Sequence, residues 1–221
     1  MRAMFFNGSP RKNWNTAKML ESAMEGARSA GAEAELVNLY DIDFKGCKSC
    51  FACKLKNART NGVCAIRDAL RPVLERAASA DVLVVGSPVY HSGITGVTHA
   101  FLERLMFPLD TYMVVDGVRQ RFLKKTVPTS MILTMNVPED ALDKWQYPTL
   151  LGINEKLMGE IFGYSESLFV CDTCQFADYS RYDVNLFSTE KKTARRDAHF
   201  ATDLANARTL GMRLVEKAQE K

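Results

Sequence analysis

The feature that most constrains the fold is an unbroken aliphatic run, Val82–Val85, bounded by Asp81 and Gly86. A strand with one face in solvent alternates apolar and polar residues, whereas every position of this run is apolar. The run therefore predicts a central strand of a parallel sheet that is covered on both faces. Because parallel neighbours are joined by crossover connections, the chain should alternate strands with helices.

The rest of the sequence alternates in this way. Apolar runs predict four more strands, at 3–7, 35–39, 127–135 and 167–171. Apolar residues at helical spacing predict helices at 16–30 (capped by Asn15 or Thr16), 68–79, 95–105, 139–160 and 190–219. The order predicts an α/β fold with a doubly wound sheet of five parallel strands and helices on both faces. We expect one domain over 1–221. It should contain an excursion at about 106–125 that forms a hairpin, and a polar, aromatic loop at 175–188.

Composition limits the classes of partner that we expect and the cellular compartment. The 221 residues are 47% apolar and carry a net charge of +3, which argues against nucleic acid as the main partner. The sequence contains neither a membrane-length apolar run nor the pattern of a secretion signal, so we expect no membrane association and a cytoplasmic location. In that compartment the six cysteines should be reduced thiols or metal ligands.

A polar loop follows the first predicted strand and leads into a helix. Unpaired N–H groups and the positive end of the helix dipole make such a helix start favourable for an anion. The loop contains neither G-x-x-x-x-G-K-[ST] nor G-x-G-x-x-G, so it is not of the nucleotide-triphosphate or dinucleotide type. It predicts a cradle for a phosphate monoester, the alternative being a polar connection without a ligand. The candidate residues are Ser9, Arg11, Lys12, Asn13, Asn15 and Thr16.

A second loop, 86–93, follows the central strand and combines an aromatic residue, a histidine and small residues. A planar ring can lie against such a loop and accept backbone hydrogen bonds along its edge. The alternative is an ordinary connection between a strand and a helix. Both loops would lie at the carboxyl ends of their strands, where doubly wound folds bind ligands.

The stretches Gly8-Ser9-Pro10-Arg11-Lys12-Asn13-x-Asn15-Thr16 and Gly86-Ser87-Pro88-Val89-Tyr90 resemble the two FMN loops of the flavodoxin-like NAD(P)H-dependent FMN reductase superfamily. The resemblance implies that the first loop holds the FMN phosphate and ribityl chain. It implies that Met135 and Asn136, after the fourth strand, form the third side of the site. The residues that would flank the isoalloxazine ring are Pro88, Val89, Tyr90, His91, Ser92 and Gly93. Trp14 is a departure, since the family often has glycine there.

Four cysteines form a separate motif, C-x2-C-x2-C-x10-C, from Cys47, Cys50, Cys53 and Cys64. This spacing lets three thiolates reach one iron–sulfur cluster, with a fourth ligand further along the chain. The motif resembles that of the iron–sulfur flavoproteins, a branch of the same superfamily in which the gap to the fourth cysteine is shorter. A 4Fe-4S cluster, a zinc ion and free or redox-active thiols all remain open.

Two further patterns predict only local structure. Cys171 and Cys174 lie three residues apart at the end of the fifth strand, which predicts one buried and one exposed thiol. The basic pairs 191–192 and 195–196 predict a solvated face of the last helix.

The sequence thus predicts an FMN-dependent NAD(P)H oxidoreductase that delivers electrons to a quinone, nitro compound, flavin or metal acceptor. No single catalytic acid or base is expected, because the cofactor carries the chemistry. One alternative is an electron carrier with FMN and an iron–sulfur cluster, which would serve a redox partner protein. Another is a non-catalytic nucleotide-binding module. The resemblance also implies a homodimer or homotetramer.

Overall fold

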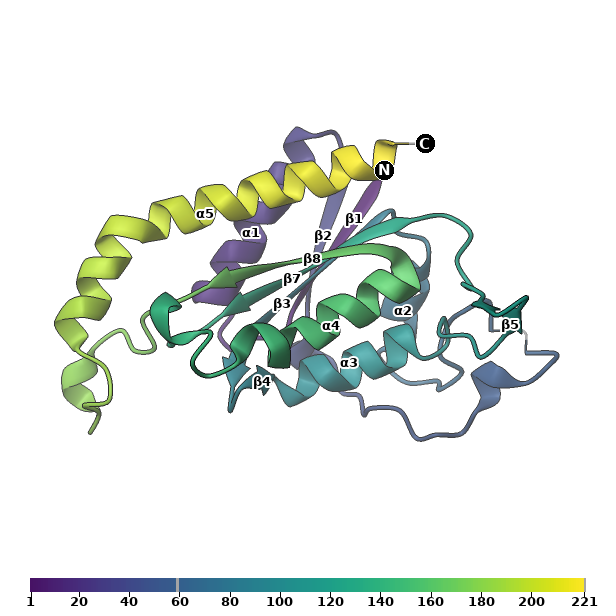
Figure 1. Ribbon diagram of the computed structural model, residues 1–221, viewed down its shortest axis with the longest axis horizontal. Coiled ribbons are helices and arrows are strands. Elements are labelled where there is room, and N and C mark those ends of the chain that lie inside the picture. The colour runs from purple at the N-terminus through teal and green to yellow at the C-terminus, as the bar shows by residue number, and fades with distance from the viewer. Residues whose placement is uncertain (59, 221) are drawn as a thin grey trace.

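The computed structural model describes residues 1–58 and 60–220, and a parallel sheet forms its centre (Figure 1). The sheet order is β2-β1-β3-β7-β8, the flavodoxin-like order of a doubly wound sheet. All four pairings along this path are parallel, so the predicted fold is confirmed. The five strands are β1 (Arg2–Asn7), β2 (Glu33–Asn38), β3 (Val82–Tyr90), β7 (Val127–Thr134) and β8 (Gly163–Val170).

The aliphatic run Val82–Val85 lies in β3, between β1 and β7, and is fully buried as predicted. The strand continues to Tyr90, through residues that we had assigned to a loop. A short strand, β4 (Gly93–Ile94), pairs antiparallel with its end. The predicted ring-binding loop is therefore mostly the end of a strand followed by a tight hairpin.

Helices cover both faces of the sheet (Figure 1). On one face lie α1 (Asn15–Ser29) and α5 (Thr189–Gln219), and on the other α2 (Arg71–Ala78), α3 (Gly96–Met106) and α4 (Tyr147–Phe162). Two glycines let α1 and α5 approach closely. A Cβ at Gly26 would lie 1.9 Å from the Arg208 carbonyl oxygen, and one at Gly211 would lie 1.8 Å from that of Ala23.

The predicted helix at 139–160 is wrong in its first third. A 3₁₀ turn, η3 (Glu139–Ala141), stands there, and Gln146 has a φ of 57° that interrupts any helix. Helix α4 begins at Tyr147, with Pro148 in its first turn, where the missing N–H costs nothing.

The excursion at 106–125 contains the expected hairpin, formed by β5 (Val114–Val115) and β6 (Val118–Arg119). Its turn residues, Asp116 and Gly117, both have positive φ. Residues 175–188 are largely irregular, apart from a 3₁₀ turn, η4 (Tyr179–Arg181). Figure 1 shows this loop beyond the carboxyl ends of the strands, where it joins the start of α5. No helix in the described part of the chain is long and apolar enough to cross a bilayer.

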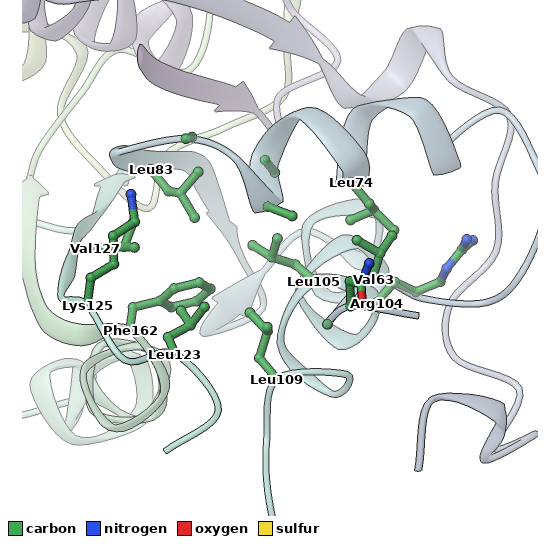
Figure 2. A pocket seen from close by; sticks show the side chains of 15 residues that line it. Val63, Leu74, Leu83, Arg104, Leu105, Leu109, Leu123, Lys125, Val127 and Phe162 are labelled. Atoms are coloured by element: carbon green, nitrogen blue, oxygen red, sulfur yellow. The ribbon is translucent and has the colours of Figure 1, made fainter. Parts of the chain in front are cut away.

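A small apolar cavity of ≈ 40 Å³ remains at the amino ends of β3 and β7 (Figure 2). Leu74, Leu83, Leu105 and Phe162 are among the side chains that line it. This cavity is a gap in core packing, at the opposite end of the strands from the polar pocket described next.

Candidate functional site

A polar pocket of ≈ 220 Å³ opens at the carboxyl ends of the sheet strands. Two walls enclose it. The first wall comprises residues 8–16 and 86–90, after β1 and at the end of β3. The second wall comprises residues 134–136 and 173–175, after β7 and β8. The lining residues are Ser9, Arg11, Trp14, Asn15, Thr16, Pro88, Val89, Tyr90, Thr134, Met135, Asn136, Thr173, Cys174 and Gln175.

Two hydrogen bonds to the main chain of Gly8 hold the first wall together. The Gly8 N–H donates to the Gly86 carbonyl at 2.8 Å, and the Thr95 hydroxyl donates to the Gly8 carbonyl at the same distance. A Cβ at position 8 would lie 1.8 Å from Thr98 Oγ1, closer than any real Cβ contact. Glycine is therefore required at this position for the two loops to meet.

The start of α1 faces the pocket without a side-chain cap, because the N-cap residue is Trp14 and not Asn15 or Thr16 as predicted. Asn15 and Thr16 lie in the first turn of the helix and line the pocket instead. The first-turn N–H groups and the helix dipole are thus open to an anion. Arg11 adds positive charge and has no carboxylate within 4.0 Å in the described chain.

Trp14, the residue that departs from the family pattern, is part of this arrangement. Its indole N–H donates to the Cys174 carbonyl at 3.1 Å, and Asn15 donates to the same oxygen at 2.9 Å. The guanidinium carbons of Arg11 and Arg196 lie 5.6 and 5.8 Å from the indole ring centre. Trp14 therefore joins the first wall to the second wall and to α5.

The second wall is a ladder between the segments after β7 and β8. The N–H of Thr173 donates to the Met135 carbonyl at 2.9 Å, and the N–H of Asp172 donates to the Val137 carbonyl at 2.8 Å. At the bottom of the pocket the hydroxyls of Thr16 and Thr134 are 2.7 Å apart, which links the two walls directly.

One polar atom of the second wall is unsatisfied. Asn136 Oδ1 is buried and has no hydrogen-bond partner in the described chain. Buried acceptors are almost always paired, so a ligand with an N–H group at its edge suits this position. A flavin ring has such an edge, and its phosphate suits the open helix start. The residues of the pocket thus fit FMN.

The structure brings nine of the predicted site residues into the pocket lining: Ser9, Arg11, Asn15, Thr16, Pro88, Val89, Tyr90, Met135 and Asn136. It leaves five outside the lining: Lys12, Asn13, His91, Ser92 and Gly93. Lys12 forms an ion pair of 2.7 Å with Asp41. His91 and Ser92 form the exposed hairpin turn between β3 and β4, with φ of 47° and 62°.

Sequence analysis missed the segment 173–175, and two of its local predictions are wrong. Cys171 and Cys174 are both buried, Cys171 in the core on the face of α2, α3 and α4, and Cys174 beside Lys192 of α5. Burial raises the pKa of Cys171 to about 11, so this thiol stays protonated at neutral pH. Lys192, predicted to be solvated, is also buried.

The cysteine loop lies apart from the pocket, against the last turns of α3. The thiols of Cys47, Cys50, Cys53 and Cys64 line one cavity of ≈ 10 Å³. The donor set suits iron or zinc, yet no group of three such ligands in the described residues is arranged to hold a metal ion. Burial raises the pKa of Cys53, and Lys54 offsets part of this effect.

Two charged residues of α3 hold the cysteine loop. The buried Arg104 donates to Cys64 Sγ at 3.3 Å and to both carboxylate oxygens of Asp68. This guanidinium lowers the pKa of Asp68 below its usual value. Glu103 accepts a hydrogen bond of 2.8 Å from the N–H of Cys47.

Comparisons with known proteins agree with the pocket. An iron–sulfur flavoprotein of Archaeoglobus fulgidus is 36% identical over 104 residues, 47% of this chain and 48% of that protein. One from Methanosarcina thermophila is 31% identical over 104 residues, 47% of this chain and 52% of that protein. The chain thus matches about half the length of these curated relatives.

The solved structure of an NAD(P)H:quinone oxidoreductase from Methanothermobacter marburgensis has the same fold. It superposes with a TM-score of 0.68 at 16% identity, over 97% of this chain and 98% of that one. The family model for NADPH-dependent FMN reductase matches residues 1–127, more than half of the sequence and all of the first wall. The resemblance of the two loops is therefore confirmed, and the chain belongs to the NADPH-dependent FMN reductase family.

Proposed function

We propose that the chain binds FMN in this pocket and acts as an NAD(P)H oxidoreductase. Its acceptor would be a quinone, a nitro compound, a free flavin or a metal-bound acceptor. The observation that carries the proposal is one pocket with an uncapped helix start beside Arg11 and an unsatisfied acceptor on Asn136. Bound FMN would supply the hydride and electron transfer. The name of the family to which the chain belongs, NADPH-dependent FMN reductase, refers to this chemistry.

The role of the protein in this proposal is to bind and orient the cofactor. Helix α1 and Arg11 receive the phosphate, the hydroxyls of Ser9 and Thr16 donate to it or to the ribityl chain, and Asn136 receives the edge of the ring. No histidine, aspartate or glutamate is among the described residues that line the pocket.

We further propose that two or more copies of the chain associate in the cytoplasm. Support comes from apolar side chains left in solvent on the excursion and on the loop 175–188. Val114 and Val118 are 60% and 63% exposed, and Leu186 is 79% exposed. Contiguous exposed apolar groups mark contact surfaces, and Val114 and Val118 belong to one two-stranded hairpin.

The test is an absorbance spectrum of the purified chain, followed by titration with FMN and turnover of NADH and NADPH with menadione and ferricyanide. We expect flavin binding and turnover that depends on FMN. Asn15→Ala should weaken FMN binding, and Asn13→Ala, in the same loop but outside the pocket lining, is the matched control. A colourless protein that binds no added FMN would refute the proposal. Binding without turnover would favour the nucleotide-binding module.

A second candidate is an electron carrier with both FMN and an iron–sulfur cluster. The observation in its favour is that four thiols from one loop line one cavity, next to Arg104. The test is anaerobic purification with iron, sulfide and zinc analysis. Cys64→Ser should lower the iron content and Cys171→Ser should not. Less than one iron atom per chain in the unmodified protein would exclude this candidate.

A further inference from the structure

A buried lysine lies directly behind the second wall. Lys192 is on the first turns of α5, between the exposed residues Lys191 and Thr193, yet it is only 1% exposed. Lysine is among the residues least often buried, because its ammonium loses hydration. A buried ammonium therefore needs specific partners, and its position calls for an explanation.

One hydrogen-bond partner of Lys192 belongs to the second wall, and the other directly precedes its segment 173–175. Its ammonium donates to the main-chain carbonyl of Asn136 and to the carboxylate of Asp172. It also lies 4.5 Å from the ring centre of Phe187, at the end of the loop 175–188. Burial lowers the pKa of Lys192, and the carboxylate of Asp172 counteracts this effect.

Both contacts fix parts of the chain that the pocket uses. Asp172 has a φ of 54°, a conformation that few residues other than glycine adopt, and it precedes the lining residue Thr173. The peptide group is planar, so a fixed Asn136 carbonyl also fixes the plane of the peptide that follows it. The side chain of Asn136 carries the unsatisfied oxygen of the pocket. One ammonium thus restrains both strands of the ladder.

We propose that Lys192 is the positioning residue of the second wall, and that it holds Asn136 and the segment 172–175 in the geometry that receives the cofactor. The inference rests on the proposed function, because that proposal identifies the ligand as FMN. Whether Lys192 restrains the wall can be measured on the protein without any ligand. It goes beyond the family match, which ends at residue 127. A wall preorganised in this way binds more tightly, because less order must be created on binding.

The experiment compares Lys192→Met/Asp172→Asn with Lys191→Met. The double variant removes both charges together, so no buried ion is left alone, and asparagine tolerates the backbone of residue 172. Lys191→Met changes the charge of the exposed neighbour and serves as the matched control. Two quantities are measured: amide hydrogen exchange at Thr173 without ligand, and the Kd for FMN.

In the double variant we expect exchange at Thr173 to be at least about tenfold faster, with a melting temperature close to that of the control. The Kd for FMN should rise by about tenfold, which corresponds to the loss of one charged hydrogen bond. Unchanged exchange and an FMN Kd within about twofold of the control would overturn the proposal, since Lys192 would then only fill space.

Failure of the proposed function gives a different result. If the unmodified chain binds no FMN, the cofactor assignment is wrong, while exchange at Thr173 still decides whether Lys192 restrains the wall. If the double variant does not fold, Lys192→Gln/Asp172→Asn tests the same link, because it also leaves no buried ion alone and keeps a polar group at position 192. Its Thr173 exchange should be at least about threefold faster than in Lys191→Met, and equal rates would contradict the proposal.

Discussion

The two walls of the pocket are built by different means. The first wall is held by close contacts at Gly8, whose N–H donates to the Gly86 carbonyl and whose carbonyl accepts from the Thr95 hydroxyl, with no room for a Cβ. The second wall is a main-chain ladder that a side chain restrains, since Lys192, from a helix late in the sequence, bonds to both of its segments. A wall with no room for a Cβ should tolerate no added atom, whereas one that a side chain restrains should weaken in steps.

The largest effect should come from Gly8→Ala. The new Cβ would lie 1.8 Å from Thr98 Oγ1 and 3.0 Å from the Gly86 carbonyl oxygen. Relief requires the loops to separate, so we expect a loss of about 3 kcal/mol in the free energy of unfolding. The Kd for FMN should rise by more than about 100-fold. Urea unfolding and flavin fluorescence titration measure the two quantities.

Gly96→Ala is the matched control, because a Cβ at Gly96 meets nothing within 4 Å at the start of α3. It should leave stability unchanged or raise it slightly, since alanine favours a helix. In the Gly8→Ala background, Thr98→Ala should recover part of the loss, because it removes the nearest atom. Equal behaviour of Gly8→Ala and Gly96→Ala would show that the first wall is not held by close main-chain contact.

The next largest effect should come from the hydroxyl pair that joins the walls. Thr16 and Thr134 are both buried, with 2.7 Å between their oxygens. Either single change to valine leaves one buried hydroxyl without its partner and should cost about 1–3 kcal/mol. Thr16→Val/Thr134→Val should cost clearly less than the sum of the two singles.

A double-mutant cycle in urea measures this coupling. Thr16→Val combined with Thr173→Val is the control cycle, because Thr173 donates to the Met135 carbonyl and not to Thr16. We expect the control cycle to be additive. Additive costs in the Thr16 and Thr134 cycle would mean that the walls are independent of each other.

The sequence predicted the first wall well because its determinants are local. One glycine, two hydroxyls and the start of a helix follow one another within nine residues, Gly8–Thr16, and their roles depend mainly on the backbone there. The apolar runs likewise predicted all five parallel strands. The prediction of a helix from periodicity was wrong at 139–146. Proline is tolerated in the first turn of a helix, so Pro148 indicates that α4 starts there.

The second wall depends on contacts between distant segments, which periodicity does not reveal. Apart from Lys192, the buried residues of α5 lie at Ala207 and beyond, so the apolar stripe of that helix gives no sign that residue 192 is buried. The segment 173–175 is held at the pocket by residues distant in the sequence, since Trp14 and Asn15 donate to the Cys174 carbonyl and Arg11 donates to the Gln175 carbonyl. Met135 and Asn136 were found through the family resemblance alone.

A smaller effect is expected for Trp14→Phe. Phenylalanine keeps an aromatic ring near Arg11 and Arg196 but loses the indole N–H that donates to the Cys174 carbonyl. Asn15 still donates to that oxygen, so the loss in stability should be about 0.5–1 kcal/mol. The Kd for FMN should rise by about threefold. A rise as large as that of Gly8→Ala would mean that Trp14, and not the main chain, sets the entrance to the first wall.

The smallest effect should come from Lys12→Ala, although Lys12 adjoins Arg11 in the same loop. Lys12 is 51% exposed and pairs with Asp41, which is 49% exposed, and such surface pairs contribute about 0–1 kcal/mol. The Kd for FMN should change by less than about twofold, whereas Arg11→Ala should raise it by about tenfold. Equal effects of the two changes would mean that Lys12 leaves Asp41 to meet the phosphate. The first wall would then respond to its ligand through a side chain, which is the behaviour expected only of the second.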